Sequence, residues 1–305
     1  MSEKLYVLGH PVSHSKSPVM YNAVYEKAEL PWHYGLMDVP TVPEAETFLA
    51  ARDFLSINIT TPYKPEAFAA ADVRAASATL AHGANVLVNK DGALIAYNTD
   101  GQGCVAYLER AGVDFHGASV VVCGTGPTSL SILHAVAQAG PDEVILIGRD
   151  KAKARNVMRT YADELGAMVD MPAFKEGHLS FSEVYKQVGF KFGSYATSRQ
   201  AIAGADIIID ATPLGMKAGD PAPFDTALLS ADQTVFDVVY GHGETALARA
   251  ARAAGCRFFD GAGMLVGQAV VTVGILRDIT GEAALDIPED ELFALMAQAA
   301  GFNLA

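Results

Sequence analysis

Cysteine and positive charge are both scarce in this chain of 305 residues. The three cysteines, Cys104, Cys123 and Cys256, are isolated, with no C-x-x-C pair and no spacing to histidine that suggests zinc. We therefore expect reduced, packed thiols and no metal. Lysine and arginine number 22 against 35 acidic residues, and the net charge of −13 disfavours binding to nucleic acid or to an anionic bilayer.

Long hydrophobic runs are also missing. The longest nearly uncharged stretch near the C-terminus, residues 264–276, contains Gln268, Thr272 and Gly274 and ends at Arg277, so it is shorter than the ~20 apolar residues that span a membrane. The Met-Ser-Glu-Lys start has no secretory hydrophobic region. Half of the residues are apolar and 19% are charged, which is typical of a globular chain long enough for two domains. We expect a cytoplasmic protein without a membrane span.

Apolar runs that alternate with helical segments predict two α/β domains. Four runs beyond residue 119 are typical of buried parallel strands in a doubly wound sheet, and they cover residues 120–123, 144–147, 207–209 and 235–239. The first hundred residues alternate in the same way, with strands at 5–8, 33–38 and 55–59 and helices from about Pro18 and over 42–52. We expect one domain from 1–101 and 265–305, a second from 102–264, and a joining helix over 100–111.

Two helices are expected close to the C-terminus. A glycine-marked turn at 261–263 is expected to precede a long helix over 265–279, and a last helix is expected over 288–300 with acidic residues in its first turn. Residues 171–199 fit poorly, because a crossover between parallel strands needs only one helix and loops are usually short. We regard them as an insertion without an assigned role.

A glycine-rich turn lies between the first strand of the second domain and the helix after it. This is the context of a dinucleotide fingerprint, because glycines let the backbone approach a pyrophosphate and the free N–H groups of the helix start bind it. Pro127 is tolerated at the first helical position, and the hydroxyls after it suit phosphate. The alternative is an ordinary turn between a strand and a helix. The turn consists of Gly124, Thr125, Gly126, Pro127, Thr128 and Ser129.

The end of the next strand bears on the choice between NADP and NAD. An acidic residue at this place binds the ribose hydroxyls of NAD, whereas an arginine suits the 2′-phosphate of NADP. Here the strand ends at Gly148 and is followed by Arg149, Asp150 and Lys151. Arg149 and Lys151 favour NADP, while Asp150 leaves NAD open.

Three further polar strings are not explained by packing alone. Singly they have ordinary interpretations, because most lysines are exposed, aspartate before glycine is common in turns, and Ser17 before Pro18 is a typical helix cap. The strings are residues 58–64, which follow a strand and end at Lys64; residues 98–101, a turn that contains Asp100; and residues 14–18.

Together these strings resemble, in order and spacing, the motifs of the shikimate dehydrogenase family. The resemblance implies an α/β fold with an N-terminal substrate domain, a Rossmann-type NADP-binding domain and an active site in the cleft between them. It also implies the reversible reduction of 3-dehydroshikimate to shikimate with NADPH. The matching segments are residues 9–18 with Asn22, 58–64, 98–101, 211–216, 237–240 and 260–269.

The same resemblance implies roles for individual residues. Ser15 and Ser17 would bind the carboxylate of the substrate, Tyr240 would approach it from the cofactor domain, and Met264 would pack near the nicotinamide. The hydroxyls of the substrate would be surrounded by Thr60, Lys64, Asn85, Asp100 and Gln268. Besides the glycine turn, Arg149 and Lys151, the implied cofactor contacts are Thr212, Met216 and Gly261.

Oxidation of a secondary alcohol needs a base for the hydroxyl proton while hydride leaves for the nicotinamide. A lysine beside a carboxylate is a coupled acid–base unit. We therefore predict that Lys64 is the proton acceptor, or at least stabilises the transition state, and that Asp100 orients it.

Departures from the family pattern affect the substrate more than the reaction. Val86 stands where the family usually has threonine, Tyr21 where it often has histidine, and Gly241 begins the pair that replaces Asn-Pro. A paralogue acting on quinate, on both acids or on an amino analogue, with NAD in place of NADP, therefore remains open. So do a binding protein that has lost turnover, a different dehydrogenase of the same architecture and assembly as a homodimer.

Overall fold

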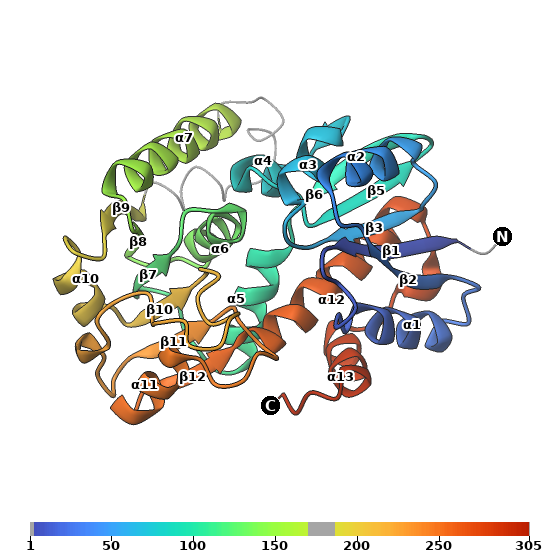
Figure 1. Cartoon of the computed structure of the whole chain (residues 1–305). Helices are drawn as coiled ribbons and strands as arrows, with labels where there is room; N and C mark the ends of the chain where they lie inside the picture. Colours follow the sequence, from blue (N-terminus) through green and yellow to red (C-terminus); the bar gives the residue numbers. More distant parts are fainter. Residues whose placement is uncertain (1–2, 170–186, 305) are drawn as a thin grey trace. The chain divides into compact units, whose positions relative to one another are not determined.

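The computed structural model describes residues 3–169 and 187–304 and divides the chain into two compact units (Figure 1). One unit comprises Met1–Gly103 and Leu265–Ala305, and the other comprises Cys104–Met264. Two helices carry the chain from one unit to the other, α5 (Asp100–Arg110) and α12 (Gly261–Thr280). Each unit is described by itself.

The first unit is built on a mixed sheet of six strands in the order β2-β1-β3-β5-β6-β4. β1 pairs in parallel with β2 and β3, whereas β5 is antiparallel to both β3 and β6. The strands are β1 (Lys4–Gly9), β2 (His33–Asp38), β3 (Ser56–Ile59), β4 (Val73–Arg74), β5 (Val86–Lys90) and β6 (Ala93–Tyr97). The helices are α1 (Ser17–Lys27), α2 (Val42–Ala51), α3 (Lys64–Ala70), α4 (Ala76–Ala81) and α13 (Glu289–Ala300), with a short turn η2 (Ala283–Leu285).

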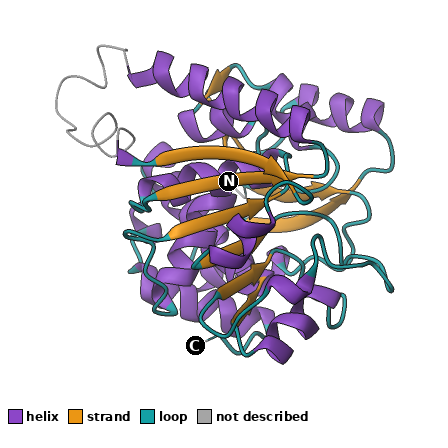
Figure 2. Ribbon diagram, turned by 90° about the vertical axis from the view of Figure 1, so that its left-hand side faces the viewer, coloured by secondary structure: helices purple, strands orange, loops and turns teal. Residues whose placement is uncertain are grey.

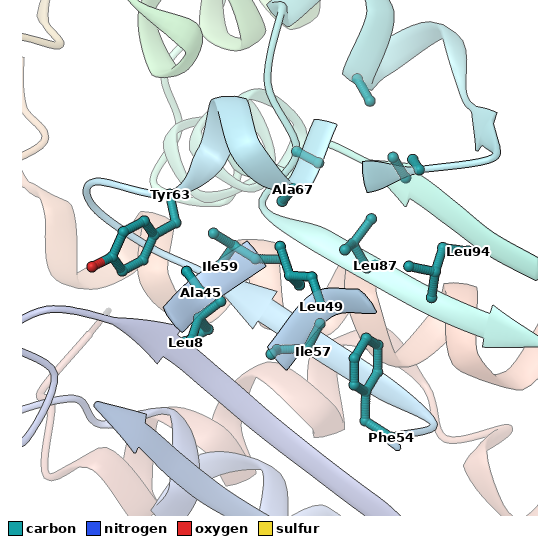
Figure 3. Close-up of a cluster of buried hydrophobic side chains, with 14 of the residues drawn as sticks. Leu8, Ala45, Leu49, Phe54, Ile57, Ile59, Tyr63, Ala67, Leu87 and Leu94 are labelled. Atoms are coloured by element: carbon teal, nitrogen blue, oxygen red, sulfur yellow. The ribbon is translucent and has the colours of Figure 1, made fainter. Parts of the chain in front are cut away.

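Helices cover both faces of this sheet. On one face α2 and α3 contribute to a buried cluster in which Leu49 and Ala67 meet Leu8, Ile57 and other strand residues (Figure 3). On the other face α1 packs against α13. Burial on both faces explains why all four residues of β3 are buried.

The second unit is a parallel sheet of six strands in the order β12-β11-β10-β7-β8-β9, with helices packed along it (Figure 2). Counted from β7, this is the order 3-2-1-4-5-6 that is typical of dinucleotide-binding sheets. The strands are β7 (Ser119–Cys123), β8 (Glu143–Gly148), β9 (Gly189–Ser194), β10 (Ile207–Asp210), β11 (Thr234–Asp237) and β12 (Arg257–Asp260). The helical segments are α6 (Pro127–Gln138), α7 (Lys151–Val169), α10 (Arg199–Gly204), η1 (Thr226–Leu228) and α11 (Ala246–Ala254).

Two sequence predictions are wrong in this unit. Gly261 to Gly263 do not form a turn, because they are the first residues of α12, where any side chain on Gly261 would strike the carbonyl of Val238. The proposed insertion is not foreign throughout, because residues 189–194 form the edge strand β9 beside β8. The rest of that prediction, residues 170–186, lies outside the described residues.

Helix α12 is longer than the uncharged stretch counted from the sequence. Among the described residues it is the one helix long and apolar enough to cross a membrane by length and composition alone. However, 61% of its most apolar window is buried inside the protein, as in the core helix of a globular fold.

Candidate active site and dinucleotide loop

Lys64 and Asp100 meet at the carboxyl edge of the sheet in the first unit. Lys64 begins α3 shortly after β3, where Pro65 is tolerated because it lies in the first helical turn. Asp100 begins α5 shortly after β6. Lys64 Nζ donates to Asp100 Oδ2, and the two side chains are only 15% and 8% exposed. The structure thus brings the two predicted catalytic residues together as a largely buried ion pair.

The Asn85 amide links this pair to its surroundings. Its Nδ2 donates to Asp100 Oδ1 at 2.9 Å and to Thr99 Oγ1 at 2.9 Å, and it lies 3.4 Å from Gln268 Oε1. Its Oδ1 accepts the backbone N–H of Thr99 at 2.8 Å, which fixes the orientation of the amide. Both Asp100 oxygens therefore have a donor, and four side chains predicted to bind substrate or catalyse, Lys64, Asn85, Asp100 and Gln268, form one hydrogen-bonded cluster.

Two glycines bring Gln268 to this cluster. A Cβ on Gly103 in α5 would overlap the backbone N of Gln268 and lie 2.6 Å from its Cα. A Cβ on Gly267 would in turn strike the carbonyl of Gly103. Only glycine at both positions allows the two helices to approach this closely, and this approach places the Gln268 side chain against Asn85 and Thr99.

The serines and Thr60 follow strands that end at the same edge. Ser15 Oγ accepts the backbone N–H of Ser17 at 3.2 Å, and Thr60 follows β3 directly. The capping interpretation of Ser17 is wrong, because α1 begins at Ser17 itself and Lys16 is the cap residue. Val86 is fully buried in β5 and presents no surface to a ligand.

Two polar residues lie within the strings 58–64 and 98–101 but are not among the predicted site residues. Thr99 lies within the string 98–101 but was not singled out, and it bonds to Asn85 and to Gln268. Asn58 interrupts the apolar strand β3, is 7% exposed, and accepts a hydrogen bond from the Tyr34 hydroxyl at 2.8 Å while its Nδ2 has no partner. A polar amide inside an apolar run was the signal that could have found it.

The glycine turn of the second unit has the shape of a phosphate cradle. Gly124 has φ +118°, and a Cβ there would strike Ser129 Oγ and lie 3.1 Å from the Ala211 carbonyl oxygen. A Cβ on Gly126 would meet no other atom within 4 Å. Pro127 is at the start of α6, as predicted. The free N–H groups of the first helical turn therefore lie next to the glycines of the turn, where no side chain blocks a ligand. These residues fit a dinucleotide pyrophosphate.

After β8, the structure gives different roles to the acidic and the basic residues that bear on the choice between NADP and NAD. Asp150 Oδ1 accepts the backbone N–H groups of Ala152 at 2.7 Å and Lys153 at 3.2 Å, so its carboxylate caps α7. Arg149 and Lys151 are exposed. This arrangement presents positive side chains and engages the acid elsewhere.

The remaining predicted cofactor contacts are spread over the second unit. Thr212 follows β10, and its N–H donates to Asp210 Oδ1 at 2.9 Å, whereas Met216 is 43% exposed. Tyr240 lies beside Gly261, and burial raises the pKa of its hydroxyl. Met264 is buried in α12, which also suits an ordinary core residue.

Metal chemistry finds no support in residues 3–169 and 187–304. No group of three or more histidine, cysteine, aspartate or glutamate side chains there could hold a metal ion. All three cysteines are buried thiols.

Comparison with known proteins agrees with this arrangement. Residues 7–87 match the family model for the shikimate dehydrogenase substrate binding domain. The NADP⁺-dependent shikimate dehydrogenase of Rubrobacter xylanophilus is 35% identical over 268 residues, which is 87% of each chain. The chain belongs to the shikimate dehydrogenase family.

Solved structures of this family share the fold along almost the whole length. Shikimate dehydrogenase from Aquifex aeolicus superposes with a TM-score of 0.77 at 23% identity, covering 98% of this chain and 97% of the other. Quinate dehydrogenase from Corynebacterium glutamicum, solved in complex with NAD, gives a TM-score of 0.76 at 26% identity and covers 97% and 99%. The two-domain α/β fold expected for a shikimate dehydrogenase is confirmed.

Proposed function

We propose that this protein catalyses the reversible, NADP(H)-dependent reduction of 3-dehydroshikimate to shikimate. The observation that carries the proposal is the buried Lys64–Asp100 pair held by the Asn85 amide, with Gln268 in the same cluster. A polyhydroxylated acid needs this mixture of charged, amide and hydroxyl groups, and hydride transfer at its alcohol needs a base.

In the direction of reduction, the Lys64 ammonium donates a proton to the oxygen that receives the hydride on its carbon; in the direction of oxidation, the neutral Lys64 amine accepts the proton of the reacting hydroxyl and becomes the ammonium of the ion pair. Asp100 Oδ2 holds Nζ in place, while Oδ1 is held by Asn85, so the lysine is oriented before substrate binds. Ser15 and Ser17 would bind the carboxylate through their hydroxyls. Thr60, Asn85 and Gln268 would hold the ring hydroxyls, and Tyr240 would also contact the substrate.

NADP, when bound, supplies the hydride donor or acceptor. The turn from Gly124 to Ser129 and the start of α6 would hold its pyrophosphate, and Arg149 and Lys151 would bind the 2′-phosphate. Asp150 is turned into a helix cap, which supports NADP over NAD. Thr212, Met216, Gly261 and Met264 would complete the cofactor site. The first unit is then the substrate domain and the second the dinucleotide domain.

The alternative that a specific observation favours is a quinate dehydrogenase. A quinate dehydrogenase structure that contains NAD resembles this chain at 26% identity over nearly its full length. Under this alternative the same Lys64–Asp100 pair would take up the hydroxyl proton of the saturated acid while its hydride leaves for the nicotinamide.

Initial rates of nicotinamide reduction decide between these functions. Shikimate and quinate are each offered with NADP⁺ and with NAD⁺, and the expected result is that shikimate with NADP⁺ exceeds the other pairs in kcat/KM by about 100-fold or more. Arg149→Ala should reduce the preference for NADP⁺ over NAD⁺. A preference for quinate would replace the proposed substrate, and ligand binding without turnover would mean that the protein is not an enzyme.

The buried thiols suit a reducing compartment, and we place the protein in the cytoplasm on that ground. Assembly as a homodimer stays a prediction.

A further inference from the structure

Two carboxylates lie side by side at the carboxyl edge of the second sheet. Asp210 at the end of β10 is in register with Asp237 on β11 and with Cys123 on β7. Neighbouring strands are about 4.8 Å apart. Among the described residues neither acid has an ion-pair partner, so two like charges would face each other in the interior of the unit.

The hydrogen bonds show which acid carries the charge. Asp237 accepts from the Val239 N–H at 3.0 Å and from Thr245 Oγ1 at 2.7 Å, so both of its oxygens are satisfied. Asp210 Oδ1 accepts the Thr212 N–H, but its buried Oδ2 has no partner. Burial first and the neighbouring Asp237 second raise the pKa of Asp210 to about 8. Asp210 is therefore the neutral acid of the pair at pH 7.

Other titratable groups around Asp210 do not supply a compensating charge. Cys123 faces it from β7 and Tyr195 from the segment after β9. Burial raises the pKa of both side chains, so both stay protonated and neutral. Burial, with Asp260 as a further like charge, also raises the pKa of Asp237, but the hydrogen bonds from Val239 and Thr245 lower it, whereas the free Oδ2 of Asp210 has no such donor. Asp237 is thus the acidic neighbour that carries the charge of the pair more readily.

Asp210 is also tied to the glycine turn. The next residue, Ala211, places its carbonyl oxygen against Gly124 and accepts a hydrogen bond from Ser129 Oγ at 3.4 Å. The residue after that, Thr212, donates its N–H to Asp210 itself. Ionised Asp210 would put a buried negative charge directly under the turn that fits a pyrophosphate.

We propose that Asp210 is a positioning residue that must be protonated for the dinucleotide to bind, so that NADP⁺ binding takes up a proton at this carboxyl. The inference rests on the proposed function, because it takes the turn to be a pyrophosphate site. A buried charge interacts strongly across the low-dielectric interior, so the ionised acid disfavours the anionic ligand. By linkage, the bound ligand must favour the protonated acid to the same extent.

The test is calorimetric titration of the whole protein with NADP⁺ at pH 8 in two buffers of different ionisation enthalpy, without substrate. The difference between the buffers gives the number of protons taken up. At this pH the 2′-phosphate is already ionised, because its second pKa is about 6. Wild-type protein should take up a fraction of a proton and lose about tenfold in affinity between pH 7 and pH 9.

Asp210→Asn copies the neutral acid and keeps the acceptor for Thr212. It should take up no proton and bind NADP⁺ equally well at pH 7 and pH 9. Asp232→Asn, which removes an exposed carboxylate from the same unit, is the matched control and should behave as wild type.

Equal proton uptake by wild type and Asp210→Asn would overturn the inference and leave the proposed function intact. If the variant does not fold, the wild-type titration still decides, because zero uptake at pH 8 contradicts the proposal. No binding of NADP⁺ at any pH by either protein would overturn the dinucleotide site, and this inference with it.

Discussion

The carboxyl edges of the two sheets handle buried charge in opposite ways. In the first unit Asp100 is compensated by a cation, Lys64, and by the Asn85 amide. In the second unit Asp210 has no cation, and its charge is removed by a proton. The Lys64–Asp100 pair keeps a proton donor and a carboxylate together in the first unit. The neutral Asp210 keeps negative charge away from the glycine turn, which suits an anion.

The difference indicates a division of labour that fold alone does not give. Both edges are formed by strands ending beside helix starts, where polar groups gather. A paired lysine and aspartate suit proton transfer, and a neutral acid under a glycine turn suits phosphate binding.

Loss of the cation should have the largest effect. Lys64→Ala leaves Asp100 buried without its compensating charge and removes the proposed base, so we expect kcat for shikimate oxidation to fall by about 10²- to 10⁴-fold. Steady-state kinetics with saturating NADP⁺ measure this, and KM should change far less.

Lys90→Ala, at an exposed position on β5, is the control and should keep wild-type kcat. A near-normal kcat for Lys64→Ala would show that Lys64 neither accepts the proton nor stabilises the transition state.

The glycine contact in the first unit should have the next effect. Gly103→Ala forces α12 away from α5, because the new Cβ overlaps backbone atoms of Gln268 that cannot rotate aside. We expect KM for shikimate to rise about tenfold and stability to fall by about 1–3 kcal/mol, while the Kd for NADP⁺ is unchanged.

Gly274→Ala in α12 is the control: its Cβ would meet nothing within 4 Å, and it should stabilise the protein by up to about 1 kcal/mol through helix propensity. If Gly103→Ala had wild-type KM, the close approach would not be what positions Gln268.

The sequence predicted the strong elements of the fold but not the short ones. Continuous apolar runs located β1, β7, β8 and β10 within a residue or two, and the alternating run 55–59 located β3. The region between Lys64 and Tyr97, where short helices alternate with antiparallel strands, was left unassigned, because runs of alanine and isolated valines have no clear period. Gly261 to Gly263 were mistaken for a turn because glycine suits both a turn and a helix that packs against backbone.

For the site, the sequence supplied the residues but not their connections. Resemblance to family motifs identified Lys64, Asp100, Asn85 and Gln268, and the structure shows which of them bond to one another. That Asp150 caps a helix could not be read from its spacing, because the same residue type serves both roles. Asp210 was missed because nothing in a strand sequence shows which neighbour will lie opposite it.

The smallest expected effect concerns stability at acidic pH, because the second unit also keeps a buried histidine neutral. Burial lowers the pKa of His134 in α6 to about 4, and its Nδ1 lies 3.2 Å from the Tyr161 hydroxyl. Between about pH 6.5 and pH 4 the unfolded chain binds a proton at this histidine that the folded protein does not, so the His134 contribution to stability must fall as pH falls through this window. We expect this contribution, measured in urea unfolding as the difference between wild type and His134→Gln, to fall by about 1–2 kcal/mol between pH 7 and pH 5.5.

His134→Gln should flatten this limb, because glutamine has no proton to gain, while His116→Gln at an exposed position should leave it unchanged. Asp210 has the opposite shift: from about pH 4 to pH 8 the folded protein holds a proton that the unfolded chain has released, so this group lowers stability as pH rises through the whole range, and Asp210→Asn should remove that effect. The two effects oppose each other between about pH 4 and pH 6.5, and the Asp210 effect alone remains from there to pH 8. Identical pH profiles for wild type and both variants would mean that neither group is kept neutral by the fold, and the contrast between the two edges would not hold.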